Sequence, residues 1–304
     1  MTIPFDLPSL PYADWAETKD TLHRFCQIVG KIRMATHPKL NHWWHVTLYP
    51  GPRGLTTRAI PYGGRSFELA FDLHDHTINL ICMSGKIESV AIAELTVAEF
   101  YDVVFAMLAR LGYNDITITP VPYDMPDKLP FPEDTRPRTY DKDAVHAYWI
   151  ALAQIANVFD NYRAGFIGKQ TPTHLYWHSF DLAVTRFSGR PAQMEGGTQA
   201  DREAYSHEVI SIGFWPGDPT FPEAAFYAYT YPEPTAIRTM PLGVEGADWA
   251  DKNGSALAVY RYEDWRKTTD PEASLLAFLN AAYDAGATLA LWDKDAFLPA
   301  VSDT

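Results

Sequence analysis

The sequence predicts an α+β protein made of two related halves, each with a helix, several antiparallel strands and a second helix, packed as one body about a pseudo-two-fold axis. Three observations predict this class. Amphipathic helical patterns alternate with groups of short strand-like runs, the runs are joined by turns too short for parallel crossovers, and the same order of elements occurs twice.

Length and composition set the broad class. A chain of 304 residues that is 47% apolar can bury a sizeable core, and its formal charge of -13 argues against general binding to nucleic acid or anionic membranes. Two cysteines, Cys26 and Cys82, fit a reducing compartment. There is neither a signal-peptide pattern nor a run of about 18 apolar residues. We therefore expect a soluble, cytoplasmic protein.

The first half is expected at residues 12–122. A helix fits from about Tyr12 to Arg33 because its apolar residues recur on one face. The clearest helix begins at Thr96, which forms a capping-box pattern with Glu99, and ends before Gly112. Strand-like patterns occupy the rest of this half, at 42–49, 54–60, 66–73, 78–83, 87–92 and 116–121.

Residues 123–140 are rich in proline and lack apolar periodicity, which predicts a connector. The second half, 141–298, begins with a helix from about Asp141 to Tyr162 and closes with a helix capped by Asp270 and Pro271. Between these helices we expect a strand-like run at 173–190 and strands at 208–214, 225–231 and 256–262, with loops at 189–202 and 232–254. A last strand is expected at 288–292.

A duplication is indicated by the spacing of residues in the two halves. Aligning His45 with His178 also aligns Trp44 with Trp177, and an arginine stands eight residues beyond each histidine, Arg53 and Arg186. Several matches in one register favour an ancient duplication, whose two copies would pair their sheets about the pseudo-two-fold axis.

Several motifs carry a resemblance to a known family: YADWAETKDTLHR, QIVGKIR, NHWWHV, SFDLAVTRFSGR, YSHEV, GFWPG and FYAYTYPEP. They resemble a bacterial family known as a domain of unknown function, over nearly the whole chain. The resemblance implies one continuous architecture and no particular reaction.

The histidines in the aromatic runs are the candidates for chemistry, because burying unpaired polar groups is costly. If His45 and His178 are equivalent, they meet near the axis, where His207 or Glu208 could join them to hold a divalent metal such as zinc or iron. Without a metal, His178 or His207 could act as an acid/base oriented by Asp181 or Glu208. On a regular strand Asp181 points away from His178, so that pair needs a bulge. The histidines could also simply pack among aromatic rings.

Three arginines are candidates for holding an anion, because guanidinium groups suit carboxylate and phosphate. Arg186 and Arg190 flank a Ser-Gly turn, and Arg53 occupies the matching region of the first half. With Trp177 and Trp44 they form the predicted ligand-binding set. Salt bridges to the many acidic residues are the structural alternative.

Together these patterns favour a small-molecule enzyme with a His/Arg-lined site between the halves, with or without the assistance of a metal. Its catalytic candidates are His178, His207, His45, Glu208 and Asp181. Two alternatives stay open: a non-catalytic protein that binds a small anion or aromatic ligand, and a structural protein with a buried polar network. The sequence does not specify the substrate, the reaction or the oligomeric state.

Overall fold

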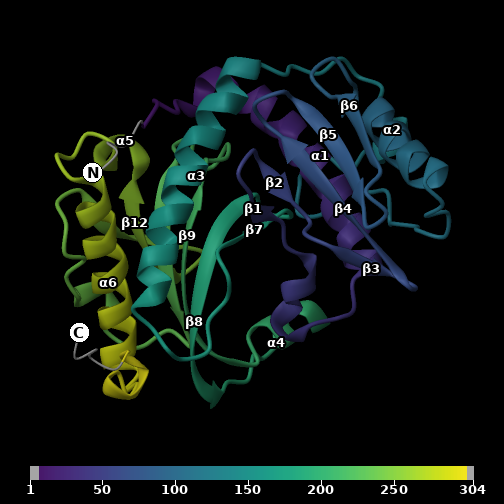
Figure 1. Cartoon of the computed structure of the whole chain (residues 1–304). Helices are drawn as coiled ribbons and strands as arrows, with labels where there is room; N and C mark the ends of the chain where they lie inside the picture. Colours follow the sequence, from purple (N-terminus) through teal and green to yellow (C-terminus); the bar gives the residue numbers. More distant parts are fainter. Residues whose placement is uncertain (1–6, 300–304) are drawn as a thin grey trace, which may run out of the picture.

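The computed structural model describes residues 7–299, which form two six-stranded antiparallel sheets with helices packed on them (Figure 1). The predicted α+β class is confirmed. None of the helices within this range combines the length and apolarity that a bilayer crossing needs.

The first sheet contains β1 (Tyr49–Pro50), β2 (Leu55–Thr56), β4 (Arg65–Asp72), β5 (Thr77–Cys82) and β6 (Ile87–Ala91) in that order, with β3 (Ile60–Tyr62) paired to β4. Helices α1 (Tyr12–Thr36) and α2 (Val97–Arg110) pack together against it. The ring of Phe100 on α2 stacks 4.0 Å from Phe25 of α1 and 6.0 Å from Phe71 of β4. The capping box of Thr96 and Glu99 is present.

The second sheet has the order β11-β12-β10-β9-β8-β7. Its strands are β7 (His174–Tyr176), β8 (Asp181–Pro191), β9 (His207–Trp215), β10 (Ala225–Tyr231), β11 (Ala247–Lys252) and β12 (Ser255–Arg261). Helices α3 (Lys142–Ala164) and α6 (Pro271–Leu289) lie side by side across one face of it (Figure 1). The short helix α4 (Gln199–Ala204) lies between β8 and β9, and α5 (Tyr262–Trp265) lies between β12 and α6. The 3-10 turns η2 (Phe131–Glu133), η3 (Ile237–Thr239) and η4 (Asp295–Phe297) lie outside the strands and long helices.

The aromatic run after α1 is a 3-10 turn, η1 (Asn41–Val46), and not the expected strand. His42 and Trp43 have φ values of 53° and 61°, and this left-handed backbone is incompatible with a strand. The run 173–190 is also interrupted, because residues 177–180 form a turn between β7 and β8.

Three other boundaries differ from expectation. Residues 116–121 carry no strand, and α6 continues through Leu289, which leaves no strand at 288–292. The expected loop at 232–254 contains β11, which returns into β12 through Asn253 and Gly254. Both residues have positive φ, 55° and 89°, as a tight two-residue hairpin turn requires.

A matched set of contacts occurs in both halves. Thr57 and Thr171 are fully buried, and each accepts a hydrogen bond on its Oγ1 from the backbone of the neighbouring long strand, Leu69 in one half and Thr185 in the other. An arginine of the preceding helix region, Arg33 or Arg163, donates to the carbonyl oxygen of the same threonine. These contacts are alike in the two halves, but they do not align His45 with His178.

The two sheets touch through their backbones at one isolated bridge. Leu48 and Leu175 exchange two N–H to O=C hydrogen bonds of 2.9 and 2.7 Å, so β7 lies beside the start of the first sheet. This contact brings the turn after β7 next to α1 and the connector.

Candidate functional site: a cleft between the halves

A cleft of about 1470 Å³ lies over the face of the second sheet that is turned away from α6. Its other walls are α1, the connector around Tyr123, the turn 177–180 and the end of α4. On the opposite face, Gly286 of α6 sits against Ile210 and Thr230, which places the even-numbered residues of β9 toward the helices. The cleft exceeds the volume of typical small-molecule sites.

The sheet wall of the cleft is polar and aromatic. Thr185, Ser211 and Tyr229 are in register on β8, β9 and β10, and the hydroxyls of Thr185 and Ser211 are 2.9 Å apart. The Tyr229 hydroxyl lies 2.9 Å from that of Tyr205, beyond α4. Burial raises the pKa of Tyr229 well above its usual value, so this phenol stays protonated at neutral pH.

Asp181 is a buried carboxylate at the start of β8, 7% exposed, with no ion-pair partner within residues 7–299. Its oxygens accept hydrogen bonds from the hydroxyls of Ser179 and Tyr227. Gly213 makes room for this arrangement, because a Cβ there would lie 2.4 Å from the Tyr227 hydroxyl oxygen. Two neutral donors therefore hold an uncompensated negative charge at the cleft wall.

His178 lies on the turn before β8 and lines the same cleft. Its Nδ1 is buried without a hydrogen-bond partner in the described part of the chain. Burial lowers the pKa of His178, while the carboxylates of Asp181, Asp124 and Asp201 act in the opposite direction. The ring is therefore neutral at pH 7 and surrounded by groups that would stabilise an imidazolium.

The turn that carries His178 is fixed by His23 of α1. The Nε2–H of His23 donates to the carbonyl oxygen of Trp177 at 2.9 Å and lies 3.1 Å from that of His178. The His23 ring stacks on Phe180 at 5.0 Å. Burial lowers the pKa of His23 to about 3, so it remains a neutral positioning group.

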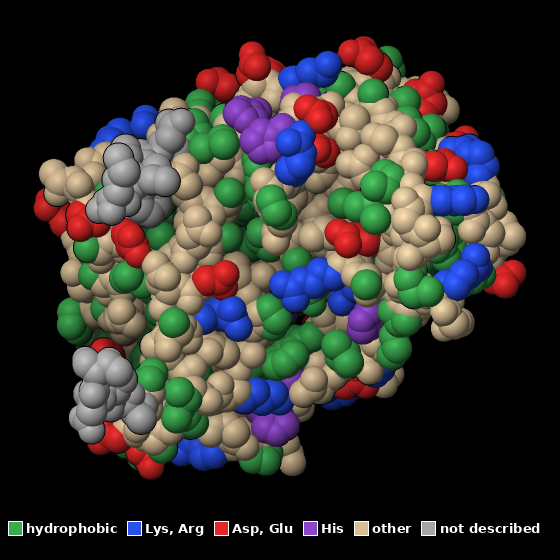
Figure 2. Space-filling model, viewed as in Figure 1, with side chains coloured by type: hydrophobic (Ala, Val, Ile, Leu, Met, Phe, Trp, Pro, Cys, Tyr) green, Lys and Arg blue, Asp and Glu red, His purple; other side chains and the backbone are tan. Residues whose placement is uncertain are grey.

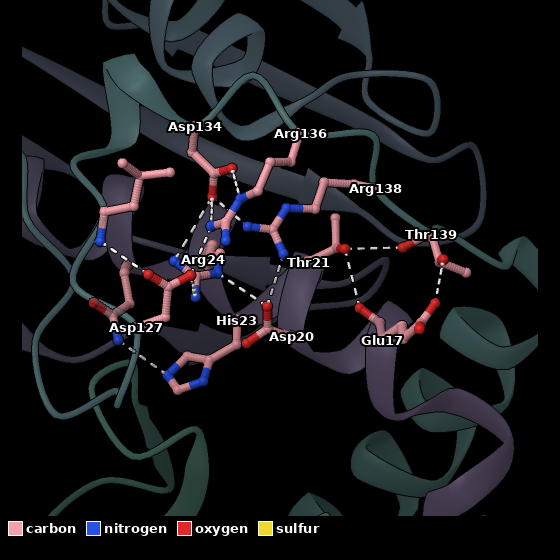
Figure 3. Close-up of polar contacts among 12 residues, drawn as sticks. Glu17, Asp20, Thr21, His23, Arg24, Asp127, Asp134, Arg136, Arg138 and Thr139 are labelled. Carbon is pink, nitrogen blue, oxygen red and sulfur yellow. Dashed lines mark hydrogen bonds and ion pairs between the residues drawn. The ribbon is translucent and has the colours of Figure 1, made fainter.

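The connector wall is held against α1 by an ionic network (Figure 3). Asp134, fully buried, faces the guanidinium groups of Arg24, Arg136 and Arg138. Burial alone would raise the pKa of Asp134, but hydrogen bonds from Arg136 and Arg138 hold it at about 2. Asp20 adds a second carboxylate between Arg24 and Arg138. The proline-rich connector is thus a fixed wall of the cleft.

Three of the sequence-predicted site residues line the cleft: His178, Asp181 and Trp177. The interrupted strand explains how His178 and Asp181 come to share it, because the turn between them breaks the alternation of a regular strand. Trp177 is 3% exposed and packs against Gly30 of α1, where a Cβ would meet its indole at 2.2 Å.

The predicted arginines lie elsewhere and make their contacts within the protein. Arg53 binds Asp72 and Asp75 at a turn. Arg190 binds Glu208, which also accepts from Ser188. Arg186 is buried on the helix side of the sheet, where it donates to the Tyr162 carbonyl oxygen and lies over three aromatic rings. None of the three is among the cleft-lining residues that the structure describes.

The remaining candidates are also outside the cleft. His45 is buried beside Trp43 and accepts from the Leu40 N–H. His207 lies 3.1 Å from the Ser206 hydroxyl, and Trp44 packs on Phe187. Between residues 7 and 299 no three His, Cys, Asp or Glu side chains gather closely enough to hold a metal, so His45, His178 and His207 do not form the expected metal set.

Two kinds of cleft residue were not predicted as site residues. Lys31 of α1 and Tyr123 of the connector line the cleft beside Trp177. Tyr227, Tyr229 and Tyr231 line the sheet wall, and their alternation along β10 is the sequence signal that could have identified a shared face.

On the face of the molecule shown in Figure 2, acidic and basic side chains are interspersed.

The fold and the cleft define an α+β protein with a large cavity walled by polar and aromatic side chains. The chain belongs to the family of unknown function DUF5996, whose model matches residues 7–298. No curated protein and no solved structure matches the chain.

Proposed function

We propose that the protein is an enzyme that acts on a small organic molecule in this cleft, with His178 as the proton acceptor. The observation that carries the proposal is the position of His178. A neutral imidazole with one unpartnered ring nitrogen lines a cleft, beside a buried carboxylate that has no cation of its own.

Asp181 would act through electrostatics. A proton taken up by His178 creates a positive charge, and the negative charge of Asp181 nearby stabilises it. Ser179 and Tyr227 keep the carboxylate in place without neutralising it. His23 would position the turn. The two cysteines are both free and buried, in keeping with a cytoplasmic location, which is part of this proposal.

The test is conversion of a defined mixture of small metabolites, followed by mass spectrometry. We expect wild type to consume at least one compound and form a product, and His178→Gln to be slower by about 100-fold or more, the usual size of a general-base contribution. The rate of Asp181→Asn should lie between those of wild type and His178→Gln. His207→Gln, which alters a histidine outside the cleft, is the matched control and should retain activity.

Full activity of His178→Gln would refute the assignment. A wild-type protein that binds a compound of the mixture and leaves it unchanged would favour the second candidate, a non-catalytic ligand-binding protein. The specific support for that candidate is the row of partly exposed tyrosines along β10, which offers ring surface and hydroxyls to a ligand. Burial raises the pKa of Tyr227 and Tyr229 well above its usual value, so these two phenols do not transfer protons at neutral pH.

A further inference from the structure

Lys31 stands out among the cations of the cleft. It is 4% exposed, and between residues 7 and 299 its ammonium group has neither a hydrogen bond nor an ion pair with a carboxylate. Its close neighbour is the Trp177 ring, whose centroid lies 5.6 Å from Nζ. A buried lysine is rarely left without a partner, because moving a charge out of water is costly.

The other buried or partly buried cations of the cleft have acidic partners. Lys19 lies near Asp20 and Asp218, which both favour its charged form. Arg138 is paired with Asp20 and Asp134. For Lys31, burial first and then the neighbouring Lys128 lower the pKa, and no carboxylate compensates. The missing counter-charge is thus specific to this position.

We infer that Lys31 binds the carboxylate of a small aromatic monocarboxylic acid, whose ring lies against the neighbouring aromatic side chains. This inference deepens the proposed function by naming the ligand class, and it rests on the cleft being a ligand site.

The aromatic ring of the ligand is inferred from the side chains that surround Lys31. Tyr123 is 50% exposed, and its ring centroid is 6.5 Å from Trp177 and 5.9 Å from His178. A carboxylate at Lys31 would place an attached ring beside Tyr123 and toward His178, where offset or edge contacts between rings are favourable.

We infer that the ligand carries a single negative charge because of the charges farther along the cleft. Asp124, Asp181 and Asp201 all act on His178, and no second unpaired cation is buried near them in the described residues. A nucleotide or another polyanion would be repelled by these carboxylates, whereas one carboxylate is matched by one lysine.

The experiment measures binding of benzoate, 4-hydroxybenzoate and indole-3-carboxylate to the full chain by calorimetry, each beside its primary amide. The amide keeps the shape and removes the charge. We expect at least one acid to bind wild type about 10-fold or more tightly than its amide. Lys31→Met should abolish that preference, and Lys31→Arg should retain part of it. Lys19→Met, which removes a cleft lysine with acidic partners, should leave it unchanged.

A second measurement separates ligand binding from a structural role. Without ligand, Lys31→Met should melt at the same or a higher temperature than wild type, because it removes an uncompensated buried charge. A lower melting temperature would mean that Lys31 stabilises the fold, and would overturn the inference. So would acids that bind no better than their amides, or a preference that survives in Lys31→Met.

The two proposals fail in different ways. Charge-selective binding at Lys31 without conversion of any compound would refute the proposed enzymatic activity and leave the carboxylate site supported. Conversion, through His178, of a substrate that carries no carboxylate would refute the carboxylate site and leave the enzymatic activity supported.

Discussion

Replacing His174 with phenylalanine should make the protein less sensitive to acid. His174, on β7, is fully buried, and neither ring nitrogen has a hydrogen-bond partner in the described part of the chain. Its ring lies between those of Tyr49 and Tyr176, at centroid distances of 6.1 and 4.8 Å. Burial lowers its pKa from 6.5 to about 3.

The sign and size of the effect follow from proton linkage. Between pH 6.5 and pH 3 the unfolded chain binds a proton at this histidine and the folded protein does not, so stability falls as the pH is lowered through that window. One pKa unit corresponds to about 1.4 kcal/mol, so moving from pH 7.5 to pH 5 costs about 2 kcal/mol at this one site. Phenylalanine binds no proton and removes this loss.

The assay is equilibrium unfolding in urea at pH 7.5 and at pH 5, followed by tryptophan fluorescence. At each pH, the free energy of unfolding of wild type is subtracted from that of His174→Phe. This difference should be about 2 kcal/mol larger at pH 5 than at pH 7.5. Comparing the two proteins at each pH cancels the titration of all other groups. Equal differences at the two pH values would refute the reasoning, because the native ring would then bind protons as readily as the unfolded chain.

Three further predictions concern stability and are measured by the same urea unfolding at pH 7.5. Asp134→Asn should cost about 3 kcal/mol, because it removes the buried carboxylate that Arg136 and Arg138 share. Glu223→Gln, at an exposed ion pair, should cost less than about 1 kcal/mol, and equal losses would contradict the role of the network. Gly30→Ala should cost about 1–3 kcal/mol by overpacking, since its Cβ would meet an indole at 2.2 Å, and an unchanged stability would show that this contact relaxes freely. Thr57→Val and Thr171→Val should each cost about 1–3 kcal/mol, because each leaves a buried backbone N–H without its acceptor; a loss at only one of them would weaken the case for equivalent positions.

Much of the fold could be predicted because its signals are local. The long helices follow apolar periodicity, and the predicted caps at Thr96 and Asp270 accept the backbone hydrogen bonds expected of them. Asp141, at the predicted start of its helix, also caps it. The hairpin at Asn253 and Gly254 was missed although Asn-Gly is a strong turn signal, because the surrounding acidic residues favoured a loop. The left-handed backbone at 42 and 43 had no sequence signal, since neither residue is a glycine or an asparagine.

The candidate site was only partly predictable. Residue type pointed to His178 and Asp181, and the structure brings both to the cleft. Strand alternation already puts Arg186 on the face opposite Asp181, so a shared site for the two was unfavourable from the start. Lys31 had no local signal, because a lone lysine on a helix is ordinarily solvated. Its importance arises from burial, which depends on distant parts of the chain.

The backbone bridge between Leu48 and Leu175 has a mechanical consequence. It joins the two sheets at one point, and His178 follows three residues later, on a turn anchored to α1. His178 is therefore tied to both halves at once, through β7 to the second sheet and through His23 to α1 of the first. Its position depends on how the two halves meet, and neither half alone determines it.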